Sequence, residues 1–441
     1  REVLSIHFGQ AGVQMGNAIW ELYCAEHAIG KDGIQIEPPL VQECQTTFFQ
    51  HSPKGQAVPR AIFVDLEPTR EVLSIHFGQA GVQMGNAIWE LYCAEHAIGK
   101  DGIQIEPPLV QECQTTFFQH SPKGQAVPRA IFVDLEPTVI GGTGAGLTAA
   151  LLDVLTDYRK YTKIEIPVYP SPSLSNSLVE PYNSILGEHF AMEDIQLGLL
   201  MDNEALYEIC SNYLSINMTT YTSINRLIAQ ATSAITASLR FPNVLNGDIN
   251  VIQTNLVPYP RIHFPLTNFA PCISPDKAEH ESLTTRELTR AVFQKENQMV
   301  KVDPTYGKFM SCSLLYRGDV SPSHVYVALM EVKATRGVDF VDWCPTGFKV
   351  GITSSPPVVI NESHVAQSDR NVVMLANNSA VGQAWQRLTH KFYLLFSKRS
   401  FIHWYIGEGM EESEFNDALV NLASLVKDYE EAALESRTRV G

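Results

Sequence analysis

The first half of the chain alternates between short apolar runs and longer stretches with helical spacing. Residues 3–8 and 61–66 are apolar runs typical of buried strands, and residues 12–27 between them have the spacing of an amphipathic helix. Further strands are predicted at 163–169 and 197–201, and further helices at 147–158, 180–190, 203–214 and 222–239. This alternation predicts an α/β fold with a doubly wound parallel sheet.

From about residue 255 the pattern becomes that of an α+β domain. Strands are predicted at 308–317, 338–343, 347–352 and 371–376, and helices at 323–333 and 380–396. A final apolar stripe, formed by Phe415, Leu419, Leu422, Val426 and Tyr429, predicts a helix packed on its own protein. Its acidic outer face is either solvated surface or a docking face for basic partners. We therefore expect an α/β domain at 1–240, an α+β domain at 241–378 and a helical region at 379–441.

An internal repeat interrupts the first domain. Residues 1–69 (copy 1) recur without a single change as residues 70–138 (copy 2). Repeat architectures have units that vary and number at least three, so we interpret this pair as a recent duplication or a sequence-assembly error. The join between the copies is far shorter than the dozen residues of a parallel crossover. Strands 61–66 and 72–77 therefore cannot be parallel neighbours in one sheet.

Composition narrows the classes of function. The 441 residues are 45% hydrophobic, as in a globular protein with two or three domains. A run of about 18 uncharged apolar residues is missing, so no membrane span is expected. The net charge of −16 argues against nonspecific nucleic-acid binding and favours basic partners or simple solubility. The eight scattered cysteines fit a reducing cytosol, and no His/Cys grouping suggests zinc.

The strongest chemical signal is the glycine run at 141–146, between a predicted strand and a predicted helix. Glycines let the backbone approach a ligand closely, and the start of the following helix offers free N–H groups to a phosphate. Leu147 stands where a dinucleotide fingerprint needs glycine and where a P-loop needs lysine. A phosphate would therefore be held by backbone amides and by Thr143, without a lysine. The alternative is a flexible glycine turn.

Two further elements occur once in each copy. Gln10 and Gln79 lie at strand-to-helix junctions, which makes each junction a second natural anion site. Glu67 and Glu136 follow the last strand of each copy. Carboxylates in that position suit a hydrated Mg²⁺, although solvated acids in a turn explain them equally well.

Two asparagines lie near predicted helix starts. Asn203 begins one helix and Asn225 lies near the start of the next. Asparagine at such a position is most often a helix cap, and it can also bind the edge of a base.

Several strings together resemble the tubulin family: GQAGVQ at 9–14, VDLEPT at 64–69, the glycine run, EPYN at 180–183, QTNLVPYPR at 253–261 and HWY at 403–405. VDWCPTGFK at 341–349 and the segment that follows it to residue 374 resemble the α class rather than the β class. The resemblance extends over nearly the whole chain except one copy of the repeat.

The resemblance implies a GTP-binding first domain, an intermediate domain, and C-terminal helices that face motors and microtubule-associated proteins. It also implies a cytoplasmic heterodimer with β-tubulin that polymerises head to tail into microtubules. Nucleotide contacts would carry over to Gln10 or Gln79, Glu67 or Glu136, Gly142, Thr143, Gly144, Asn176, Asn203, Tyr221 and Asn225. Glu67 or Glu136 would also orient Mg²⁺.

The chain departs from the family at functional positions. Copy 2 occupies the stretch where the family has further strands and helices of the nucleotide domain, and Ile140 replaces a glycine at the start of the glycine run. Val251 stands where α-tubulins place a catalytic glutamate that acts on GTP of the next β subunit, while Asp248 remains to orient water. We therefore expect GTP binding with little or no turnover. The alternatives are a dinucleotide-binding oxidoreductase, or a chimeric tubulin that does not assemble.

Overall fold

The structure is a computed structural model whose described residues fall into two compact units, 1–70 (unit 1) and 71–441 (unit 2). Each unit is described by itself. In unit 1 the described residues are 5–8, 24, 29, 49–51, 57–59 and 61–64. In unit 2 they are 72–105, 115–121, 124–133, 143–155, 162–170, 177–216, 218–241, 243–245, 249–278, 283–334, 338–344, 347–360 and 365–434.

Both copies of the repeat form the same strand pairs. In copy 1 the strands are β1 (Ser5–Phe8), β2 (Phe49–His51), β3 (Ala57–Pro59) and β4 (Ala61–Val64). In copy 2 they are β5 (Ser74–Phe77), β6 (Phe118–His120), β7 (Ala126–Pro128) and β8 (Ala130–Val133). The pairs β1–β4 and β5–β8 are parallel, the pairs β2–β3 and β6–β7 are antiparallel, and the registers match between copies. Each copy therefore pairs with itself, as the short join between copies requires.

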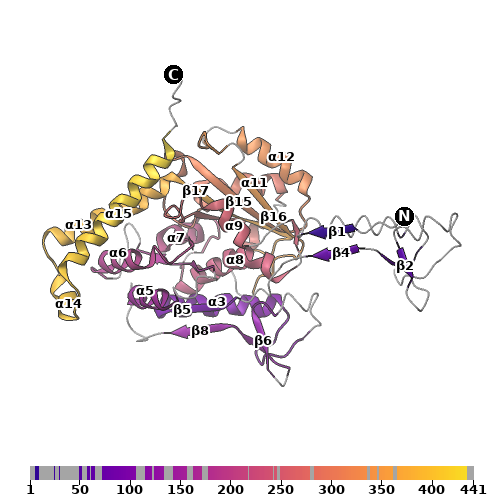
Figure 1. The fold of residues 1–441 in the computed structure, drawn as a ribbon, viewed down its shortest axis with the longest axis horizontal. Helices are drawn as coiled ribbons and strands as arrows, with labels where there is room; N and C mark the ends of the chain where they lie inside the picture. Colours follow the sequence, from indigo (N-terminus) through magenta and orange to yellow (C-terminus); the bar gives the residue numbers. More distant parts are fainter. Residues whose placement is uncertain are drawn as a thin grey trace. The chain divides into compact units, whose positions relative to one another are not determined.

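Helix α3 (Gly78–Glu95) anchors copy 2 in unit 2. Its apolar residues recur at helical spacing, and they bury one face that includes Met84, Ile88 and Tyr92. This face packs on α8 (Tyr221–Arg240), a long helix that is buried along most of its length. Figure 1 shows α3 running beside β5 and below α8.

The predicted α/β pattern after the glycine run is confirmed, with shorter strands. The expected strand at 163–169 is divided at Pro167 into β9 (Ile164–Glu165) and β10 (Val168–Tyr169), since proline cannot donate to a strand ladder. The next expected strand is also divided, into β11 (Leu197–Gly198) and β12 (Met201–Asp202). Strand β9 pairs in parallel with β11, and β10 pairs in parallel with β12. Helix α5 (Thr143–Val154) precedes these strands, α6 (Glu180–Ala191) lies between β10 and β11, and α7 (Asn203–Asn212) follows β12.

A five-stranded mixed sheet follows in the order β13-β16-β15-β17-β14. Its strands are β13 (Asn243–Leu245), β14 (Leu266–Ala270), β15 (Phe309–Gly318), β16 (Phe348–Thr353) and β17 (Arg370–Asn378). Helices α9 (Ile249–Leu256), α10 (Pro275–Ala278), α11 (Thr285–Val292) and α12 (Pro322–Lys333) lie between the strands along the chain. Because β14 buries even its polar residues, it lacks the alternation by which a strand is detected in a sequence.

The strand predicted at 338–343 is wrong. Only Phe340 pairs, in an isolated bridge to Phe309. Its ring packs on those of Phe309 and Phe348, with centroids 5.7 and 5.0 Å apart. The apolar spacing of this segment therefore reflects an aromatic contact rather than a ladder of hydrogen bonds.

The C-terminal region is helical, with α13 (Gly382–Ser397), α14 (Ile402–Gly407) and α15 (Glu412–Ala433). The predicted stripe on α15 is confirmed, because Phe415, Leu422, Val426 and Tyr429 are buried and Leu419 packs against the same cluster. Figure 1 shows α13 and α15 side by side, in agreement with their contacts.

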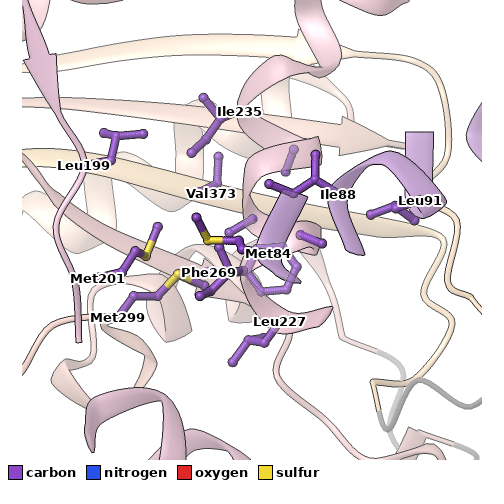
Figure 2. Packing of buried hydrophobic residues seen from close by; sticks show 14 of the residues in the cluster. Met84, Ile88, Leu91, Leu199, Met201, Leu227, Ile235, Phe269, Met299 and Val373 are labelled. Carbon is purple, nitrogen blue, oxygen red and sulfur yellow. The ribbon is translucent and has the colours of Figure 1, made fainter. Parts of the chain in front are cut away.

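The main core joins copy 2 to the mixed sheet. Met84 and Ile88 of α3 share one cluster with Leu227 of α8, Phe269 of β14 and Val373 of β17. Figure 2 shows these side chains converging from separate elements. Copy 2 is therefore part of the core of unit 2 rather than an appendage to it.

A buried ionic cluster strengthens the same junction. The Glu95 carboxylate of α3 binds the Arg240 guanidinium of α8 and lies 2.6 Å from that of Arg317 of β15. The Ser233 hydroxyl donates to the same carboxylate at 2.7 Å. Burial alone would raise the pKa of Glu95, but the two guanidiniums lower it to about 2. Since all three charged side chains are almost inaccessible, each depends on the others for compensation.

Two other buried carboxyls have no such compensation. Glu165 Oε2 of β9 and Glu188 Oε1 of α6 are buried without hydrogen-bond partners, while the Tyr169 hydroxyl donates to Glu188. Burial raises the pKa of Glu165 to about 7. Burial and the nearby Glu165 charge raise the pKa of Glu188 to about 8. Because these values exceed those of an unfolded chain, the folded protein holds the protons more tightly.

This pair predicts a loss of stability at alkaline pH. Its contribution is complete below the unfolded pKa of about 4.5 and declines as pH rises through 7 and 8. Between pH 6.5 and 8.5 we expect a decline of about 3 kcal/mol in the free energy of unfolding, of which Glu188→Gln removes about 2 kcal/mol. Urea unfolding at several pH values measures the slope. Glu193→Gln, at an exposed position just beyond α6, serves as the control; equal slopes in the two variants would refute this assignment.

Candidate functional site

The site begins where copy 2 meets the glycine run. Strand β5 ends at Phe77, and α3 starts at Gly78 with φ +68°, a conformation that favours glycine. A Cβ built on Gly78 would lie 3.7 Å from the backbone of Gly144, and one on Gly144 would lie 3.4 Å from the Phe77 carbonyl oxygen. The structure therefore places the strand-to-helix junction of copy 2 against the first turn of α5.

Helix α5 begins inside the glycine run, at Thr143. The Thr148 hydroxyl donates to the Gly144 carbonyl oxygen at 2.8 Å, so it stabilises the helix itself. On the other side, a Cβ on Gly187 of α6 would lie 2.6 Å from the Cβ of Ala145. Close packing on both sides fixes the start of α5 and excludes the interpretation of residues 143–146 as a flexible glycine turn.

The electrostatics of these two helix starts suit an anion. The residue before α3, Phe77, provides no side-chain cap, and the first turns of α3 and α5 contain no acidic residue. By contrast, Asp202 caps α7 and Thr220 caps α8 through side-chain oxygens. An uncapped helix start leaves N–H groups and the positive end of the helix dipole for a ligand. The described residues around Gly78 and Gly144 therefore fit a phosphate group.

Gln79 occupies the second position of α3 and is half-buried. It lies directly after the glycine that contacts α5, so copy 2 places its glutamine at the predicted anion site. The equivalent Gln10 of copy 1 lies outside the described residues.

A second set of candidate residues gathers where α7 contacts α8. Asn203 and Tyr207 are one turn apart on α7, and Tyr221 and Asn225 are one turn apart on α8. The rings of Tyr207 and Tyr221 meet edge to face with centroids 6.5 Å apart. The two tyrosines therefore meet across the helices, and each helix carries an asparagine one turn from its tyrosine.

The structure excludes the simpler explanation of both asparagines. Asp202 and Thr220 cap the two helices, so neither Asn203 nor Asn225 does. Within the described part of the chain neither carboxamide has a hydrogen-bond partner, and both residues are partly exposed. Carboxamides with no partner among the described residues, on helices that also carry an exposed tyrosine ring, are suited to hydrogen bonding and stacking with a planar base.

Tyr207 was missed by the sequence analysis. It follows Asn203 by one helical turn, so this spacing was the available signal. Burial raises its pKa, with the neighbouring Tyr221 as a second cause.

Several predicted site residues lie outside the described residues: Gln10, Glu67, Glu136, Gly142, Asn176 and Asp248. Thr143 and Val251 are described as helical, in α5 and α9, without their side chains. In the described ranges no group of three or more His, Cys, Asp or Glu side chains is arranged to hold a metal ion. Glu67 and Glu136 therefore remain predictions as Mg²⁺ ligands.

Two family models match this chain. The model described as "Tubulin/FtsZ family, GTPase domain" matches residues 2–70, 71–141 and 138–211, and the model described as "Tubulin C-terminal domain" matches 260–390. The first two matches nearly coincide with the copies of the repeat, and the third contains α5 and α7. No helix in the described ranges is long and apolar enough to cross a bilayer. Since both models describe tubulin domains and together take in more than half of the residues, the chain belongs to the tubulin family of GTP-binding cytoskeletal proteins.

Proposed function

We propose that this protein is an α-tubulin-like subunit that binds GTP, pairs with β-tubulin and polymerises head to tail into cytoplasmic microtubules. The close approach of Gly78 to Gly144, where an added Cβ would touch the Gly144 backbone, is the observation that carries the proposal, because it supports a phosphate site between α3 and α5. In this site Gln79, Gly142, Thr143 and Gly144 bind the phosphates. Asn203, Tyr221 and Asn225 bind the guanine, with Asn176 on the ribose side.

Copy 2, rather than copy 1, supplies the phosphate side of the site in this proposal. Glu136 of copy 2 then orients Mg²⁺, which would neutralise phosphate charge when bound. Glu67 of copy 1 is the equivalent carboxylate. The acidic outer face of α15 is the proposed docking surface for motors and microtubule-associated proteins.

The matched glutamines test which copy binds nucleotide. Gln79→Ala removes a polar side chain next to the phosphates, and we expect it to weaken GTP binding about tenfold. Gln10→Ala is the matched control because it makes the same change in the same local sequence, and we expect it to leave affinity unchanged. Nucleotide titration with a fluorescent GTP analogue measures both. A larger effect of Gln10→Ala would assign the site to copy 1.

Nucleotide content discriminates GTP binding from the alternative of a dinucleotide-dependent oxidoreductase. Acid extraction of the purified protein should release about one GTP per chain. Bound NAD without GTP would favour the oxidoreductase, although Leu147 in place of the third glycine speaks against it.

A further inference from the structure

The surface that holds α3 in unit 2 fits either copy of the repeat. We call this surface the seat: it consists of Gly144 of α5, Thr236 and Arg240 of α8, and Arg317 of β15. A Cβ built on Gly78 would touch the Gly144 backbone, the Tyr92 hydroxyl lies 2.8 Å from Thr236 Oγ1, and Glu95 binds both arginines. Copy 1 carries Gly9, Tyr23 and Glu26 at the corresponding positions. Its sequence therefore contains every group with which copy 2 binds the seat.

The described strands of copy 1 pair as those of copy 2 do. Its strands pair with the registers Ser5↔Ala61 and Phe49↔Pro59, which correspond to Ser74↔Ala130 and Phe118↔Pro128 in copy 2. The same sequence with the same strand pairs would make contacts of the same strength. Local interactions therefore cannot distinguish the two copies, and only their distance along the chain from α5 can.

We propose that the two copies compete for the seat, so that the protein exchanges between a major state with copy 2 seated and a minor state with copy 1 seated. The nine residues 134–142 join β8 to α5, whereas the 78 residues 65–142 would join β4 to α5. Closing the longer loop is disfavoured about 25-fold because the entropic cost grows with the logarithm of loop length. Chain connectivity thus sets the preference for copy 2.

This exchange limits the loss of stability that substitutions in copy 2 can cause in unit 2. A change that weakens the seating of copy 2 by more than about 25-fold makes copy 1 the favoured occupant. Further weakening of copy 2 then has no effect, because copy 1 stabilises unit 2 in its place. Copy 1 is thus an alternative occupant of the seat.

Substitution of the paired glutamates tests this exchange. Glu95→Gln leaves two buried guanidiniums without their carboxylate, which weakens the seating of copy 2 by about 100-fold or more. Because copy 1 can then occupy the seat, the equilibrium constant for unfolding should change by at most about 25-fold. Glu26→Gln alone should change nothing, but in the Glu95→Gln background it should cause a further loss, at least fourfold in urea unfolding. No further loss in the double variant would overturn the proposal.

Hydrogen exchange detected by mass spectrometry locates the seated copy directly. Glu90→Asp, at an exposed position of α3, marks copy 2 peptides by mass and leaves the seat contacts intact. When Glu95→Gln is added, hydrogen exchange should become faster in the marked peptide and slower in the unmarked peptide that contains Glu26. Unchanged exchange of the unmarked peptide would overturn the proposal. Protection of the unmarked peptide that increases with protein concentration would also overturn the proposal, because it would indicate that the copies exchange between chains.

Discussion

Replacing Arg317 with alanine is expected to lower the free energy of unfolding by about 3–5 kcal/mol. Arg317 lies in β15, outside the repeat, so no second copy can replace it. Its loss leaves Glu95 with one guanidinium in a site closed to water, and it also removes hydrogen bonds to the carbonyl oxygens of Ser355 and Pro356. Urea unfolding of purified protein, monitored by tryptophan fluorescence, measures the change.

Arg290→Ala is the control for loss of an arginine–glutamate pair. Arg290 contacts Glu331 at 3.2 Å, but its side chain is 55% exposed. An exposed pair of this kind contributes about 0–1 kcal/mol, so we expect a small change. Equal effects of the two substitutions would contradict the role of the buried cluster in joining copy 2 to the mixed sheet.

Introducing a carboxylate at Val251 is expected to raise GTP hydrolysis in filaments formed with β-tubulin by about 10²–10⁴-fold. This prediction depends on the proposed function and on the resemblance to α-tubulins, which implies that residue 251 of α9 faces the nucleotide of the next subunit. Valine cannot polarise a water molecule, whereas the glutamate of Val251→Glu can. Phosphate release during polymerisation with purified β-tubulin measures the rate.

Asn250→Glu provides the matched control, since it adds the same charge one residue earlier on α9 and therefore on another side of the helix. We expect it to leave hydrolysis slow. If both variants accelerate hydrolysis equally, the effect comes from charge alone and not from a positioned group. If neither does so in filaments that form normally, the proposed orientation of α9 is wrong.

The sequence predicted the repeat but not the role of each copy. Because the copies are identical, no residue in them distinguishes the one that packs against α5. In the proposed exchange the deciding factor is the short connection from β8 to α5, whose effect is entropic and leaves no pattern of apolar residues. The burial of Glu95 could not be predicted from the sequence either, because its partners Arg240 and Arg317 lie far along the chain.

Local patterns predicted most elements well. The amphipathic helices appear close to their expected positions because 3.6-residue spacing is a strong signal over several turns. The prediction of a strand at 338–343 was wrong because two alternating apolar residues in a short segment do not distinguish a strand from a loop in which one aromatic ring is packed. For Asn203 and Asn225, the preceding Asp202 and Thr220 were the better cap candidates, as the structure places them.

A nucleotide-bound structure, determined by cryo-electron microscopy of the purified protein, would show whether GTP binds between α3 and α5. We expect a guanine nucleotide whose phosphates lie against the first turns of α3 and α5, beside Gly78 and Gly144, and whose base lies beside Asn203 and Asn225. A nucleotide bound elsewhere, or side chains filling the space between these helix starts, would contradict it.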